Sequence, residues 1–186
     1  MARVPLVYPK MPGPAGAGSG RCVAFEKSDG TNLHWMWTRG RGWHAFGTRR
    51  SRFDLGAAGV AAFDAAHPGL PDAADLFRRD LAGPLGDPLA ADGCAGATVF
   101  TEYLGDRSFA GTHAPGDPKR LVLFDILLDD GVVPPERFME RFAGLPTARV
   151  VYRGPLTGAF TEDVRRGRYD VREGVVCKGG RAPGAV

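Results

Sequence analysis

The hydrophobic and polar positions along the chain predict many short strands interrupted by a few helices. Apolar, aromatic and β-branched residues gather in short segments bounded by glycine, proline and other turn-forming residues. The strands predicted in this way are 21–25, 32–38, 97–104, 120–128, 148–152 and 171–178. The segment 120–128 is almost continuously apolar, which is typical of a central strand.

Helical periodicity occurs in three parts of the chain. Apolar residues recur at helical spacing across 56–82, and the turn-forming stretch 68–71 interrupts them, so two helices are expected there. A third helix is expected to begin at residues 134–136, because proline is tolerated in the first turn of a helix. A short helix over 161–166 is expected to be capped by Thr161.

The order of these elements favours an α+β domain built on antiparallel sheets, because strands and helices do not alternate strictly. A chain of 186 residues with 44% hydrophobic residues fits a single domain, 1–186. The segment 11–20 is rich in glycine and proline and can bury almost nothing, so we expect a flexible loop. The segment 179–186 is expected to be a disordered end.

The composition favours a cytoplasmic protein that does not enter membranes. No segment approaches the roughly 18 consecutive apolar residues of a membrane span, and the N-terminus lacks the apolar stretch of a signal peptide. The three cysteines are odd in number and far apart, so neither a disulfide framework nor a cysteine-based zinc site is expected.

The scarcity of lysine draws attention to Lys27. Of the 24 basic side chains only four are lysines, whereas arginine supplies the rest. Arginine stays protonated, but a lysine can lose its proton and act as a nucleophile. Lys27 follows a predicted strand and precedes the turn-forming residues 28–30. A surface lysine in a hairpin turn is the alternative interpretation.

Four short motifs follow one another along the chain. They are Lys-Ser-Asp-Gly at 27–30, Phe-Thr-Glu-Tyr-Leu-Gly at 100–105, Leu-Phe-Asp-Ile at 123–126 and Glu-Gly-Val-Val-Cys-Lys at 173–178. In this order they resemble the motifs of the covalent nucleotidyltransferases, the superfamily of polynucleotide ligases and messenger RNA capping enzymes. The flanks of Lys27, together with the second motif, are most similar to those of the ATP-dependent RNA ligases.

The resemblance covers about residues 22–178 and implies both a fold and an activity. The fold would be an antiparallel-sheet nucleotidyltransferase domain, an ATP-grasp-like ligase adenylation domain with flanking helices. The activity would be that of an ATP-dependent RNA ligase that acts in RNA repair. Lys27 would form a lysyl-AMP intermediate with ATP and Mg²⁺, or Mn²⁺, and AMP would then pass to the 5′-phosphate of an RNA or other polynucleotide end.

The resemblance also implies a set of nucleotide-binding residues. These are Glu26, Asn32, Arg50, Glu102, Phe124 and Lys178. Phe124 would stack on the purine and Glu102 would accept a hydrogen bond from the ribose. Arg50 would hold phosphate, with Arg49 as the alternative. Glu173 would lie at the metal, and Asn32 would orient metal-bound water.

Other functions remain open at this point. The family carries a further Lys-x-Lys motif, which this sequence lacks, so Lys178, nearby arginines, a protein partner or a missing C-terminal segment would have to replace it. A nucleotide- or RNA-binding module without efficient transfer is therefore one alternative. A capping-type enzyme that uses GTP is another, and a DNA ligase, which normally needs an extra domain, fits least well.

Two groups of polar or aromatic residues are ambiguous. Arginines alternate with tryptophans across 35–52, which fits either nucleic-acid contact or a strand pair with a tryptophan core. The four histidines lack metal-ligand spacing, so a zinc site is not expected. His113 either lies near the cleft or is a turn residue, and the second interpretation is favoured.

Overall fold

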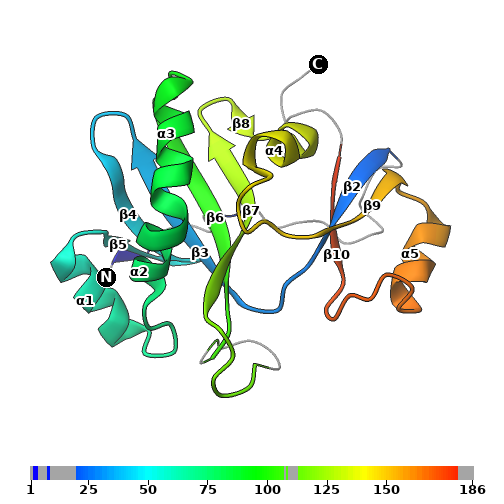
Figure 1. The fold of residues 1–186 in the computed structure, drawn as a ribbon, viewed down its shortest axis with the longest axis horizontal. Helices are drawn as coiled ribbons and strands as arrows, with labels where there is room; N and C mark the ends of the chain where they lie inside the picture. Colours follow the sequence, from blue (N-terminus) through cyan, green and yellow to red (C-terminus); the bar gives the residue numbers. More distant parts are fainter. Residues whose placement is uncertain (1, 4–7, 9–19, 107, 109–112, 180–186) are drawn as a thin grey trace.

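Two antiparallel sheets form the framework of the molecule (Figure 1). The computed structural model describes residues 2–3, 8, 20–106, 108 and 113–179. The larger sheet has the order β1-β5-β4-β3-β6-β7-β8 and the smaller one has the order β10-β2-β9. The strands of the larger sheet are β1 (Ala2–Arg3), β3 (Thr31–Thr38), β4 (Gly42–Thr48), β5 (Ser51–Asp54), β6 (Gly96–Leu104), β7 (Arg120–Leu128) and β8 (Gly131–Val132). The smaller sheet consists of β2 (Arg21–Glu26), β9 (Val150–Pro155) and β10 (Val175–Gly179).

Helices cover one face of the larger sheet and the outer side of the smaller one (Figure 1). The helices are α1 (Ala57–Ala66), α2 (Ala73–Phe77), α3 (Gly83–Ala91), α4 (Pro135–Phe142) and α5 (Gly158–Arg165), and a π-helical turn, Arg78–Ala82, joins α2 to α3. The main core lies between the larger sheet and the first helices. There the Trp35 ring stacks on Phe77 and on Phe46 at centroid distances of 4.0 and 5.2 Å.

The structure confirms the antiparallel α+β architecture and corrects several boundaries. The helix break at 68–71 lies between α1 and α2, as predicted. The helix expected to be capped by Thr161 begins earlier, because the Thr157 hydroxyl accepts a 3.1 Å hydrogen bond from the Phe160 amide and caps α5. The last strand begins at Val175, four residues later than the predicted start.

The tryptophans interspersed with these arginines belong to a strand pair and pack into the core. Trp35 and Trp37 are buried, and the Trp35 indole donates a 2.9 Å hydrogen bond to the Thr101 hydroxyl. The half-buried Trp43 donates to the carbonyl of Ala82 at 2.8 Å. The structure therefore supports the tryptophan-core alternative, and Trp35 and Trp37 do not present their rings to a nucleic acid.

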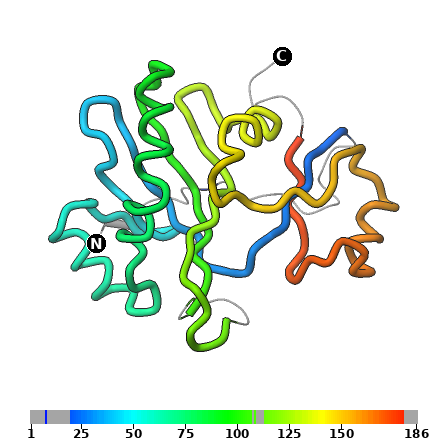
Figure 2. The backbone as a smooth tube through the Cα atoms, viewed as in Figure 1, coloured from blue at the N-terminus to red at the C-terminus, as the bar shows by residue number. Residues whose placement is uncertain are grey.

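The chain crosses from the smaller sheet to the larger one at residues 27–30 (Figure 2). Strands β2 and β3 belong to different sheets, so the alternative that Lys27 lies in a hairpin turn is wrong. Gly30 passes so close to β6 that a Cβ atom there would collide with the Tyr103 carbonyl oxygen and lie 2.8 Å from Glu102 Cγ. The glycine therefore brings the segment after Lys27 directly over Glu102.

A β-bulge in β7 turns two neighbouring side chains toward the same face. Phe100 on β6 pairs with Asp125, and the next residue, Thr101, pairs with Leu123, so Phe124 is the extra residue. A bulge of this kind redirects side chains that would otherwise alternate. Phe124 and Asp125 consequently both face away from the helices, toward the smaller sheet.

Three further expectations concern cysteines, membranes and the chain ends. Cys22, Cys94 and Cys177 are free thiols. Within the described part of the chain, no helix is long and apolar enough to cross a membrane. The expected loop 11–20 and the expected disordered end 179–186 lie, apart from Gly20 and Gly179, outside the described residues.

Candidate active site

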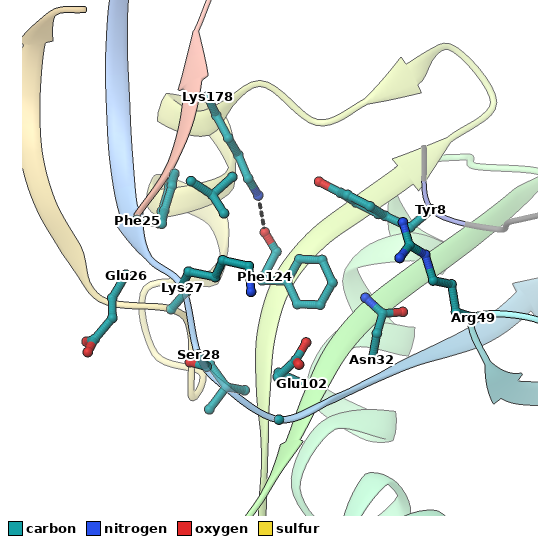
Figure 3. Close-up of a pocket in the computed structure, with 14 residues that line it drawn as sticks. Tyr8, Phe25, Glu26, Lys27, Ser28, Asn32, Arg49, Glu102, Phe124 and Lys178 are labelled. Atoms are coloured by element: carbon teal, nitrogen blue, oxygen red, sulfur yellow. Dashed lines mark hydrogen bonds between the residues drawn. The ribbon is translucent and has the colours of Figure 1, made fainter. Parts of the chain in front are cut away.

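A pocket of about 300 Å³ lies between the two sheets (Figure 3). Six of the residues predicted from the sequence line it, namely Glu26, Lys27, Asn32, Glu102, Phe124 and Lys178. The other two predicted residues, Arg50 and Glu173, do not line it, although Glu173 contacts Lys27. Residues that are far apart in the sequence therefore meet in one cavity.

Lys27 stands where β2 leaves the smaller sheet. Its amide donates a 2.9 Å hydrogen bond to the carbonyl of Gly174, which fixes the backbone beside the segment that precedes β10. Its ammonium group forms an ion pair with the Glu173 carboxylate. The Lys27 side chain is 43% exposed, so a ligand in the pocket can reach it.

Glu102 is a partly desolvated carboxyl group opposite Lys27. Asn32 on β3 pairs with Glu102 on β6, so the two side chains share the face of the sheet that lines the pocket. The pKa of Glu102 is raised to about 7, mainly by burial and also by the charge of Glu173, while Lys27 and the hydrogen bond from the Gly30 amide limit the rise. A group in this environment can act as either a donor or an acceptor near neutral pH.

Glu102→Gln is expected to stabilise the protein at alkaline pH. The unfolded chain ionises Glu102 near its ordinary value of 4.5, but the folded chain holds the proton up to about pH 7. The free energy of unfolding of the wild type therefore falls as the pH rises from 4.5 to 7, and the variant escapes this loss. Above pH 7 the variant should be more stable by about 3 kcal/mol.

Urea unfolding at pH 4.5 and pH 8 measures this difference. The exposed Glu140 on α4 gives a matched control, since Glu140→Gln should change stability little at either pH. Equal stability of wild type and Glu102→Gln at pH 8 would show that Glu102 is not held in its protonated form.

Aromatic and aliphatic side chains form the wall next to these polar groups. The half-buried Phe124 meets the Tyr8 ring edge-on at a centroid distance of 5.4 Å. Val176 on β10 pairs with Phe25 on β2, and both line the pocket. The wall offers an aromatic ring and flat apolar surface to a planar ligand.

Lys178 is tied to the sheet behind Phe124. Its ammonium group donates to the Phe124 carbonyl, shown dashed in Figure 3, and lies 3.1 Å from the Asp125 carboxylate. Asp125 also accepts a 2.8 Å hydrogen bond from the Tyr8 hydroxyl. Burial lowers the pKa of Lys178 and raises that of Tyr8. Three parts of the chain, β7, β10 and the N-terminal Tyr8, thus meet at Asp125.

The turn between β4 and β5 contributes Arg49 to the pocket. Figure 3 shows the Arg49 guanidinium next to Tyr8. Arg50, the residue favoured from the sequence, is exposed and does not line the pocket. The geometry therefore favours Arg49, the alternative, as the arginine that can reach a ligand.

Sequence reasoning missed Tyr8 and Val176. Tyr8 lies in a proline-flanked segment without periodicity, so no signal in the sequence places it at the pocket. Val176 could have been found, because it lies inside the Glu-Gly-Val-Val motif two residues before Lys178, so that both side chains share a face of β10. His113, considered a turn residue, lines a second pocket beside Lys27.

The protein side chains do not by themselves form a metal cage. No group of three or more His, Cys, Asp or Glu residues suited to a metal ion occurs among the residues that the structure describes. The carboxylate of Glu173 beside Lys27 is 35% exposed. This arrangement fits a magnesium-type ion held by one carboxylate and by oxygen atoms of a bound phosphate, as is common for Mg²⁺.

The two sheets and their flanking helices make up the nucleotidyltransferase fold of the RNA ligases. Two solved structures of Naegleria gruberi RNA ligase share it. A lysine-to-methionine variant with AMP and Mn matches 84% of this chain with a TM-score of 0.59, and a lysine-to-alanine variant with ATP and Mn matches 88% with a TM-score of 0.61. Identity is 12% in both, and the chain spans 46% and 48% of those ligase chains. No protein-family model and no curated protein sequence matches the chain.

Proposed function

We propose that this chain is an ATP-dependent, RNA-ligase-like nucleotidyltransferase that forms lysyl-AMP on Lys27 and passes AMP to a polynucleotide 5′-phosphate. The main support is the position of Lys27, at a pocket that combines an aromatic wall with the buried carboxyl group of Glu102. The likeness of the fold to an RNA ligase solved with ATP and Mn points in the same direction.

The pocket residues fit the parts of a nucleotide. The base would stack on Phe124, with Val176 also in the wall, and the ribose would hydrogen-bond to Glu102. Neutral Lys27 would attack the α-phosphorus, so that an N–P bond forms and the bond to pyrophosphate breaks. Arg49 would hold phosphate, and Glu26, whose carboxylate accepts a 2.9 Å hydrogen bond from Arg149, would keep the start of this segment in place.

A divalent cation, Mg²⁺ or Mn²⁺, would offset the negative charge of the phosphates. Glu173 would be its protein ligand and Asn32 would orient its bound water, which leaves the remaining positions to phosphate oxygens and water. In the structure the same Glu173 carboxylate pairs with Lys27, so a cation held there would lie next to the nucleophile.

One observation favours a second candidate, a nucleotide-binding module without efficient transfer. Transfer in the family uses additional lysines at the phosphates, and Lys178 would have to replace them. In the structure its ammonium is held by Asp125 and by the Phe124 carbonyl, with 14% of the side chain exposed. A module of this kind would bind ATP in the same pocket and would never carry a covalent adenylate.

Intact-protein mass spectrometry after incubation with ATP and Mg²⁺ separates the two candidates. A gain of one adenylate, located by peptide mapping on the segment that contains Lys27, is the expected result. Parallel incubation with GTP tests for a capping-type enzyme. Folded protein that binds ATP without any mass gain would overturn the proposal and support the binding module.

Phe124→Ala is expected to weaken ATP binding as well as the fold. Stacking of a base on an aromatic ring contributes about 1–3 kcal/mol, so the dissociation constant should rise by about tenfold or more. Calorimetric titration with ATP measures the change. Phe160→Ala, which removes an aromatic residue from the separate cluster with Tyr152, is the control and should leave affinity unchanged. Unchanged affinity in folded Phe124→Ala would leave Phe124 as an ordinary core residue.

A further inference from the structure

A second pocket of about 610 Å³ adjoins the first one at Lys27. The two pockets share Glu26, Lys27 and Ser28. The first pocket has aromatic and aliphatic walls, whereas no Phe, Tyr or Trp is found among the described residues that line the second. Most side chains that line the second pocket are polar or charged, which favours a polar ligand group there.

Two arginines on the walls of the second pocket have no ion-pair partner among the described residues. Arg120 and Arg172 are exposed, and neither guanidinium has a hydrogen bond or ion pair with any residue in the described ranges. Most carboxylates of the same walls are already engaged. Glu173 pairs with Lys27, and Asp117 accepts a 2.9 Å hydrogen bond from the amide of Ala114.

The two arginines come from different sides of the second pocket, and the backbone of Arg120 is fixed by its pairing with Leu104. Arg120 begins β7 in the larger sheet, and Arg172 precedes Glu173 at the approach to β10 in the smaller sheet. The loop before Arg120 is anchored on the Lys27 segment, since His113 Nε2 lies at hydrogen-bond distance, 3.0 Å, from the carbonyl oxygen of Asp29. Lys119 holds the end of that loop through a 2.7 Å ion pair with Asp72.

We propose that Arg120 and Arg172 bind the phosphate group that leaves, or arrives, when AMP is transferred to or from Lys27. This inference rests on the proposed function and assigns the second pocket within it. Guanidinium groups match phosphate oxygens with paired hydrogen bonds, and both are placed beside the nucleophile. The chemistry is shared by two sources, the pyrophosphate that leaves ATP and the 5′-phosphate that arrives on the polynucleotide.

Both half-reactions bring such a group to the same position. In the first, the neutral Lys27 amine forms the N–P bond and gives up a proton to solvent, while the P–O bond to pyrophosphate breaks and pyrophosphate takes the electron pair of that bond. In the second, an oxygen of the 5′-phosphate bonds to the adenylate phosphorus, the N–P bond breaks, and the electron pair returns to the Lys27 nitrogen, which takes up a proton. The arginines would hold the phosphate in each case without touching the nucleoside.

The test uses adenylated protein and two separate acceptors. Wild type and the double variant Arg120→Gln/Arg172→Gln are loaded with ATP and purified. One arm adds inorganic pyrophosphate and follows the return of ATP. The other adds a 5′-phosphorylated oligoribonucleotide, with a 5′-hydroxyl oligoribonucleotide as the blank, and follows AMP transfer. Arg165→Gln on α5, also an exposed arginine, is the matched control.

The half-saturating acceptor concentration should rise by about tenfold or more in the double variant, because hydrogen bonds between charged groups are lost. The rate at saturation should stay close to that of the wild type, as should all values for Arg165→Gln. The arm that shows the change identifies the source of the phosphate. Unchanged half-saturation in both arms would overturn the inference and leave the proposed function standing.

If wild type takes up no adenylate, that result counts against the proposed function. A direct binding measurement then still tests the role of the two arginines. Calorimetric titration with pyrophosphate and Mg²⁺ should then show weaker binding to the double variant than to wild type and Arg165→Gln. Equal binding to all three proteins would overturn the inference. Both replaced side chains are exposed, so the double variant should fold. If it does not, the single variant Arg172→Gln is titrated in the same way.

Discussion

Lys27→Arg should incorporate no adenylate, although it keeps the positive charge at the end of β2. Arginine remains protonated under all conditions in which the protein is folded, so it has no free electron pair with which to attack phosphorus. It can still form an ion pair with Glu173, so the pocket should stay assembled. Intact-protein mass spectrometry with ATP and Mg²⁺ should show the unmodified mass, whereas wild type gains one adenylate.

The control for this variant is another lysine of the same chain. Lys119 lies in the loop before β7 and pairs with Asp72 at 2.7 Å, outside the first pocket. Lys119→Arg should be adenylated like the wild type. ATP binding by Lys27→Arg, measured by calorimetry, separates a chemical defect from a binding defect. Adenylate on Lys27→Arg would remove Lys27 from the mechanism.

Asp125→Ala is expected to lower the free energy of unfolding by about 3–5 kcal/mol, because it removes the only carboxylate among the described residues that pairs with the largely buried Lys178 charge. Only 3% of the Asp125 side chain and 14% of the Lys178 side chain are exposed. The Tyr8 hydroxyl loses its acceptor in the same variant. Urea unfolding of the whole chain measures the loss, and Asp130→Ala in the exposed turn after β7 should change stability little.

A second substitution should rescue this variant. An apolar pair of similar volume often replaces a buried ion pair without loss of stability. Asp125→Leu/Lys178→Met should therefore recover most of the free energy lost in Asp125→Ala. A loss below about 1 kcal/mol in Asp125→Ala, the range of an exposed ion pair, would show that the Asp125–Lys178 pair is solvated in solution.

Much of the pocket could be predicted because its residues lie in strands or at their ends. Lys27, Glu102 and Phe124 belong to recognisable short motifs, and their common order along the chain indicated a common site. Strand boundaries followed from apolar runs, as for β7, whose bounds match the predicted 120–128. The short strands 42–48 and 51–54 were missed, because glycine and arginine interrupt their alternation.

The remaining features depend on tertiary contacts that a sequence does not display. Arg49 and Arg50 occupy adjacent positions of one turn, and the direction of that turn decides which of them meets the pocket. Tyr8 reaches the pocket through its contacts with Asp125 and Phe124 rather than through any local pattern. The resemblance implies that Lys178 binds the nucleotide, and the sequence does not show that a carboxylate on a strand of the other sheet holds it.

Because of the bulge at Phe124, the role of β7 in the pocket depends more on the number of residues in the strand than on the identity of its surface residues. The extra residue lets one strand place Phe124 in the aromatic wall and also pair Asp125 with Lys178 of the smaller sheet. Leu123 and Ile126 stay in the core. Deleting a single residue here would restore a regular ladder and keep the hydrophobic core, yet it would leave only one side chain where two are required. Insertions and deletions in this strand should therefore be tolerated far less well than substitutions at its surface.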